Sequence, residues 1–165
     1  MKEINYKDMK FNPFNLIGGE WMLVTAGNEQ KCNTMTASWG HLGCLWGHND
    51  PTAVIYLRPS RYTKEFVDEE GYFSLCVMDK SFKKQMAYLG SVSGRDEDKI
   101  AKAGLTPVYA ITLSISRKPS WCSSARRCMP QKSSPVASSI KKQSTRVIRR
   151  VTITPCTSVR SRRCW

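Results

Sequence analysis

The distribution of charge divides this 165-residue chain into two chemically different parts. All 13 Asp and Glu residues lie at or before Asp98, and residues 1–110 carry 13 Lys and Arg as well, so that part is net neutral. Residues 111–165 carry the other 13 Lys and Arg and no acid. All ten Gly, five Phe and six Tyr also lie before residue 111. We therefore predict a globular domain over 1–110 and a basic Ser- and Arg-rich tail over 111–165 that is disordered or irregular.

Three explanations compete for the tail. A basic arm would bind nucleic acid or another polyanion, and this composition is also typical of a solvated, disordered tail. The third explanation is a frameshift after Ala110, in which each true codon joins the third base of one tail codon to the first two bases of the next. Trp121–Cys122 must then encode Val, and Met129–Pro130 must encode Ala. Favourable choices of the remaining bases give segments such as KLVLLCKKMY that are typical of strands. We favour the frameshift and do not expect nucleic acid as a partner.

The composition also argues against a membrane segment and a metal site. Residues 1–14 are polar and charged, unlike a signal peptide, and no apolar run is long enough to cross a membrane. The three cysteines before residue 111 and the pair His41 and His48 lack metal-ligand spacing. These observations predict a cytoplasmic protein with reduced thiols and no metal.

Short strands alternate with short helices in the first 110 residues. Apolar and β-branched patterns predict strands at 21–26, 34–40, 52–57 and 72–77, and residues 41–50 are Gly-rich and predicted to be a loop.

Helices are expected over 60–68 with Ser60 as N-cap, over 81–90, and over 94–104. The pattern indicates a small barrel with helices on its outside.

The segment Arg58–Thr63 is the first candidate for a ligand site. It places two guanidinium groups, hydroxyls and a phenol where a predicted strand ends and a helix begins. Backbone N–H groups and the positive end of the helix dipole also face such a point, so anions bind there. An ordinary capped helix with two solvated arginines would have the same local sequence.

Two further segments are rich in small or hydroxylated residues. Asn33–Trp39 would leave room for a flat ring against a strand, whose N–H groups and hydroxyls could bond the ring edge, although Thr residues packed on a neighbouring strand would look the same. Gly90–Lys99 could wrap a polar ligand or be a surface loop. No residue stands out as a nucleophile or general base, and we name no catalytic residue. The chemistry would have to come from a bound cofactor.

Taken in order, Asn33–Gly40, Arg58–Thr63 and Gly90–Asp96 resemble the flavin reductase-like proteins, including their flavoredoxin-like branch. The resemblance covers about residues 10–109, and the ordered set of segments is specific. It implies a mainly β fold with short helices, a Greek-key split β-barrel, and FMN held at the interface of a homodimer. The basic tail replaces the family's last strands, so we expect the C-terminal strands to be disrupted.

The resemblance also implies a function and a site. Family members transfer electrons between NAD(P)H and flavin as oxidoreductases, or carry electrons on bound FMN without nucleotide reductase activity of their own. The first segment would line the isoalloxazine ring, the second would hold the ribityl phosphate, and the third would close over the flavin. The implied cofactor-binding residues are Asn33, Thr34, Met35, Thr36, Ala37, Ser38, Trp39, Arg58, Ser60, Arg61, Tyr62, Thr63, Ser93, Gly94 and Arg95.

We expect the coding DNA to lack one base near codon 110, because the composition changes there within a few residues. Sequencing codons 105 to 115 in both directions from the source tests this. An intact frame would make the basic tail genuine and would place the polyanion-binding hypothesis ahead of flavin reduction.

Overall fold

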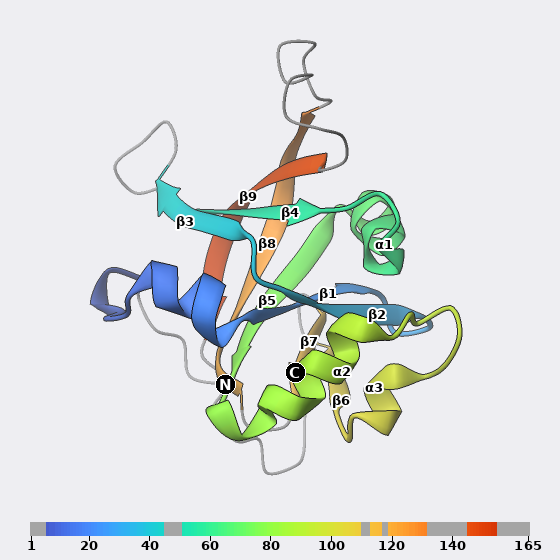
Figure 1. The fold of residues 1–165 in the computed structure, drawn as a ribbon. Helices are drawn as coiled ribbons and strands as arrows, with labels where there is room; N and C mark the ends of the chain where they lie inside the picture. The colour runs from blue at the N-terminus through green and yellow to red at the C-terminus, as the bar shows by residue number, and fades with distance from the viewer. Residues whose placement is uncertain (1–5, 45–50, 110–112, 117–118, 132–144, 155–165) are drawn as a thin grey trace, which may run out of the picture.

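The computed structural model describes residues 6–44, 51–109, 113–116, 119–131 and 145–154 (Figure 1). The strands are β1 (Met22–Gly27), β2 (Cys32–Ala37), β3 (Gly40–Cys44), β4 (Pro51–Leu57), β5 (Tyr72–Met78), β6 (Thr106–Tyr109), β7 (Leu113–Ser116), β8 (Pro119–Gln131) and β9 (Thr145–Thr154). The helices are α1 (Tyr62–Glu70), α2 (Lys83–Ser91) and α3 (Lys99–Lys102), with the short helical turns η1 (Tyr6–Asp8), η2 (Asn15–Glu20) and η3 (Lys80–Phe82).

Seven strands form one antiparallel sheet in the order β2-β1-β5-β8-β9-β4-β3, and β6 pairs with β7 separately. The two ends of this order, β2 and β3, are consecutive in the chain and separated only by Ser38 and Trp39. The connection therefore brings the two edges of the sheet together at one corner, and the sheet curls into an incomplete barrel (Figure 1).

The sheet packs on both of its faces. Met22 and Val24 of β1 belong to a core that includes Phe66 of α1, whereas Leu23 between them belongs to a second core with Leu89 of α2. Successive side chains of a strand point to opposite faces, so a single strand supplies both cores. Helix α1 thus packs on one face of the sheet, and α2 packs on the other.

The prediction of a mainly β fold with short helices is confirmed, but the prediction of a loop over 41–50 is wrong in its first part. Residues Gly40–Cys44 form β3, which pairs with β4. A Cβ atom on Gly40 would lie 2.6 Å from the Val54 carbonyl oxygen, so this close approach of two strands requires glycine. Gly-rich sequence therefore marks close strand packing here, and residues 45–50 lie outside the described part.

The predicted helix boundaries also need correction. Ser60 is not the N-cap of α1: it lies in a turn closed by the Arg61 N–H and the Arg58 carbonyl (3.0 Å), and Arg61 occupies the N-cap position. The second helix runs past Gly90 to Ser91.

The third helix does not begin at Gly94. It begins at Lys99, where the Asp98 carboxylate caps it by accepting from the Ala101 N–H (3.1 Å). Side-chain capping by Asp98 thus sets the start of α3, and the position of Gly94 alone predicts that start wrongly.

Three strands lie inside the segment 111–165, for which we predict disordered or irregular structure. The described backbone places β8 and β9 between β5 and β4 in the large sheet. Residues 117–118, 132–144 and 155–165 lie outside the described part, and disruption of the C-terminal strands stays a prediction. In the described residues no helix is long and apolar enough to span a membrane.

Candidate functional site

A hollow of about 80 Å³ opens where the end of β2 meets the end of β4. Two of the three segments singled out in the sequence line it together, although some twenty residues separate them. The lining residues are Met35, Thr36, Ala37, Ser38, Trp39, Tyr56, Arg58 and Arg61. The fold therefore joins the small-residue segment to both arginines of the second segment.

The position of β2 in the sheet explains why its backbone is available at this site. In the described part of the chain β1 is the only strand that pairs with β2. The opposite backbone edge of β2 thus has no strand on it, and an edge of this kind offers N–H and C=O groups to another partner.

Positive charge gathers at the hollow. The Arg58 guanidinium carbon lies 5.9 Å from the centre of the Trp39 ring, and Trp39 is 55% exposed. Arg61 donates from Nη1 to the Gly90 carbonyl (2.8 Å). Burial, followed by the charge of Arg58, lowers the pKa of Arg61. Among the described residues that line the hollow there is no acid, so the site favours an anion.

Four of the remaining predicted residues form a packed cluster beside the hollow. Asn33 Nδ2 donates to Thr63 Oγ1 (2.9 Å), and both side chains are buried. A Cβ atom on Gly94 would lie 2.2 Å from Asn33 Oδ1 and 3.3 Å from Tyr62 Cδ1, so only glycine fits at this contact. Asn33, Tyr62, Thr63 and Gly94 thus join β2, α1 and the loop after α2.

Arg95 lies on the outer side of this cluster. Its guanidinium carbon is 4.5 Å from the centre of the Tyr62 ring, and it pairs with Glu65 of α1. It also donates to the Ser60 carbonyl (3.5 Å), and its own backbone N–H donates to Ser93 Oγ (3.2 Å). These contacts tie the loop to the start of α1.

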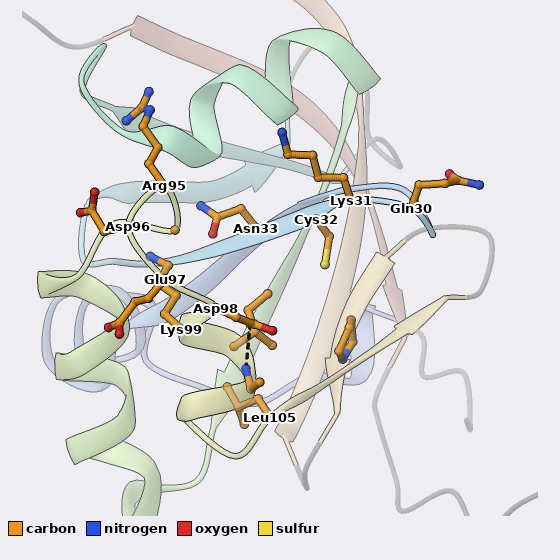
Figure 2. Close-up of a pocket in the computed structure, with 14 residues that line it drawn as sticks. Gln30, Lys31, Cys32, Asn33, Arg95, Asp96, Glu97, Asp98, Lys99 and Leu105 are labelled. Carbon is orange, nitrogen blue, oxygen red and sulfur yellow. Dashed lines mark hydrogen bonds between the residues drawn. The ribbon is translucent and has the colours of Figure 1, made fainter.

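A second cavity, of about 440 Å³, lies between the turn preceding β2 and the loop between α2 and α3 (Figure 2). It is larger than the hollow, but it is lined by acids as well as bases, and three of these charged groups bind other parts of the protein. Glu97 pairs with Lys102, Asp98 caps α3, and Lys99 donates to two carbonyl oxygens. The hollow, where two guanidinium groups lie without an acid among the described lining residues, is therefore the candidate ligand site.

The hydroxyl groups of β2 bind protein atoms. Thr34 is buried, and its Oγ1 lies 2.9 Å from Thr25 Oγ1 and 3.2 Å from the Val24 carbonyl oxygen. Thr36 donates to the carbonyl of Met86 in α2. These two hydroxyls hold the strand in place, which leaves the strand backbone for a ligand.

Two residues near the site escaped the sequence analysis. Tyr56 lies between the buried Ile55 and Leu57, and this alternation already indicates a side chain on the other face of β4. Its hydroxyl lies 3.0 Å from Nδ1 of His41. Lys99, which is 3% exposed, carries no sequence pattern that marks it as buried.

His48 lies outside the described residues. Within the described ranges no group of three or more His, Cys, Asp and Glu side chains could hold a metal ion.

A family model for the flavin reductase like domain matches residues 14–122. The chain belongs to this family. An uncharacterized protein of Escherichia coli K12, YddH, is 28% identical over 109 residues, a match that covers 62% of this chain. The match spans 56% of YddH, little more than half of that protein's length.

Solved structures share the fold of this flavin reductase-like chain. Flavoredoxin of Desulfovibrio vulgaris (Miyazaki F) has a TM-score of 0.68 at 22% identity, with 82% of this chain and 69% of that chain covered. An FMN-binding protein from Thermus thermophilus with bound 1-cyclohex-2-enone has a TM-score of 0.66 at 16% identity, with 92% and 78% covered. A Shewanella frigidimarina protein with a split barrel domain has a TM-score of 0.64 at 20% identity, with 83% and 67% covered. The predicted split-barrel fold is confirmed.

The hydrogen bonds of Thr34 lead to a prediction about stability. A hydroxyl has one hydrogen, so if Thr34 donates to the Val24 carbonyl, Thr25 donates to Thr34. Thr34→Val leaves the buried hydroxyl of Thr25 without an acceptor, and it should lower the free energy of unfolding by about 1–2 kcal/mol. Thr25→Val should lower the free energy of unfolding by less, because only the Thr34 hydroxyl oxygen, as an acceptor, loses its partner.

The double variant should cost less than the sum of the two single variants. Urea unfolding of all four chains gives the coupling. Additive effects within about 0.3 kcal/mol would contradict the hydrogen bond.

Proposed function

We propose that this chain binds FMN at the hollow. The observation that carries the proposal is the meeting of Met35–Trp39 with Arg58 and Arg61 around one opening. A strand edge and an indole suit a flat ring, and guanidinium groups suit a phosphate. The residues present thus fit both ends of the cofactor.

The phosphate would lie at the start of α1. Arg61 is at the N-cap of this nine-residue helix, where the first backbone N–H groups and the helix dipole favour an anion. Arg58 and Ser60 are exposed on the preceding turn. Tyr62 and Thr63 would act by packing, because Tyr62 contacts Phe66 with ring centres 4.9 Å apart and Thr63 binds Asn33.

A second copy of the chain would complete the site. Pockets that enclose ligands of this size usually measure about 300–1,000 Å³, whereas the hollow measures about 80 Å³. One chain therefore supplies part of the enclosure. Trp39 at its rim is 55% exposed, as expected for an aromatic residue that another chain covers. We propose a homodimer with FMN between the two subunits.

When bound, FMN would supply the redox chemistry, and the protein would supply orientation and electrostatics. We propose that NAD(P)H is the electron donor and that the protein is an NAD(P)H-dependent oxidoreductase. The alternative is an electron carrier without nucleotide reductase activity, which the structural likeness to flavoredoxin supports.

FMN binding should depend on Arg58. Arg58→Ala removes a charge-assisted contact to the phosphate and should raise the Kd for FMN about tenfold, with little change for riboflavin, which lacks the phosphate. Titration of flavin fluorescence measures both constants, and sedimentation of the same samples reports whether flavin travels with a two-chain species. Lys84→Ala, an exposed change on α2, is the control.

If Arg58→Ala weakened the binding of FMN and of riboflavin equally, Arg58 would not bind the phosphate. A wild-type chain that binds neither flavin would overturn the proposed function, and the same titration on the frame-restored chain would then show whether residues 111–165 are the cause.

NAD(P)H oxidation separates the two functional proposals. With FMN bound, the wild-type protein should oxidise NADH or NADPH under air, which the loss of nicotinamide absorbance follows. A protein that binds FMN but oxidises neither nucleotide, while exchanging electrons with a chemical reductant, would be an electron carrier.

A further inference from the structure

Lys99 is a buried cation bound to the end of a neighbouring helix. It is 3% exposed, and its ammonium donates to the carbonyl oxygens of Leu89 and Val92, each at 2.9 Å. These carbonyls lie at the C-terminus of α2, where the last turn of a helix leaves C=O groups without helical partners. Lys99 on α3 therefore supplies hydrogen bonds to these carbonyls and holds the end of α2 in place.

Arg61, at the N-cap of α1, binds the same end of α2. Its guanidinium donates to the Gly90 carbonyl (2.8 Å), which lies next to Leu89 in the chain. Two cations, one from α3 and one from the N-cap of α1, thus hold three carbonyls within four residues. The Gly90 carbonyl, which Arg61 binds, therefore lies in the chain between the two carbonyls that Lys99 binds.

We propose that Lys99 is a positioning residue of the flavin site: it fixes the end of α2 so that Arg61 is held beside the hollow, ready for the phosphate. This inference rests on the proposed function. Lys99 itself lines the separate cavity of Figure 2 and not the hollow, so it acts through Arg61.

Electrostatics supports this role. Burial, together with the charge of Arg61, lowers the pKa of Lys99 to about 8. Arg61 in turn is next to Arg58, whose charge adds to burial in lowering the pKa of Arg61. Burying a cation near another cation is unfavourable for stability. An anion bound at the hollow would offset that repulsion. The arrangement therefore makes the protein less stable without a ligand and favours phosphate binding.

The test compares Lys99→Met, which keeps the length of the side chain and removes its donors, with Lys99→Arg, which keeps the charge. Lys102→Met is the matched control, because Lys102 lies on the same helix and pairs with Glu97 at the surface. Fluorescence titration gives the Kd for FMN and for riboflavin. Lys99→Met should raise the FMN Kd about tenfold and leave the riboflavin Kd within about twofold. Lys99→Arg should restore part of the loss.

A second readout needs no flavin. The Val92 N–H donates to the Tyr88 carbonyl (3.1 Å) at the end of α2, so its hydrogen exchange should become faster in Lys99→Met and stay unchanged in Lys102→Met.

Each outcome decides something. The positioning role is overturned, and the proposed function stands, in two cases in which the wild-type chain binds FMN. In the first, Lys99→Met weakens the binding of FMN and of riboflavin equally. In the second, it weakens the binding of neither. If the wild-type chain binds neither flavin, both are overturned. Unchanged exchange at Val92 in Lys99→Met would refute the structural step by itself.

Discussion

The buried hydrogen bond between Asn33 and Thr63 (2.9 Å) is the interaction on which the arrangement of the site depends. It joins an edge strand to the first turn of α1, and the loop after α2 closes over it because residue 94 is glycine. Asn33 ties this edge strand to α1, as Thr36 ties it to α2. Together with the packing of Met35 in the core that contains Phe66, this contact fixes the small residues of β2 relative to the arginines before α1.

Buried polar groups concentrate around the same strand. In the described part of the chain the buried polar and charged residues are Thr25, Asn33, Thr34, Thr63, Ser74 and Lys99. Thr25 pairs in register with Thr34 on one side and with Ser74 on the other, and Lys99 holds the helix that packs over Thr36. Such groups cost desolvation energy unless their hydrogen bonds are made, as they are for these residues except Ser74, so they specify one geometry more than they add stability.

The sequence predicts much of the fold because its apolar pattern is local. The strands expected at 52–57 and 72–77 are observed at Pro51–Leu57 and Tyr72–Met78. The strand expected at 34–40 is observed earlier, at Cys32–Ala37, because the chain turns at Ser38 and starts β3 at Gly40. Pairing with β4 decides that turn, and pairing between distant segments leaves no local pattern.

The sequence also predicts which segments meet at the candidate site, but not all of their contacts. The order of three segments identifies the family, and two of them do meet at the hollow. Sequence alone does not show that the Thr34 hydroxyl binds Thr25, or that Lys99 is buried under the end of α2. Both depend on which faces meet after the sheet curls.

The topology makes the composition of the C-terminal segment matter for the whole sheet. β8 and β9 lie in the middle of the strand order, between β5 and β4, and the core-facing side chains of a central antiparallel strand are usually apolar and alternate with polar ones. Residues 111–165 carry 13 Lys and Arg and no acid. The half of the hollow on β2 is joined to β8 through β1 and β5, whereas Tyr56 lies in β4 and Arg58 just after it, on the far side of β8 and β9. The link through Asn33 and Thr63 bypasses β8 and β9. It can hold the two halves of the hollow together only as long as α1 stays packed on the first core, and so flavin affinity should respond to changes in β8 and β9, which lie between those halves in the sheet.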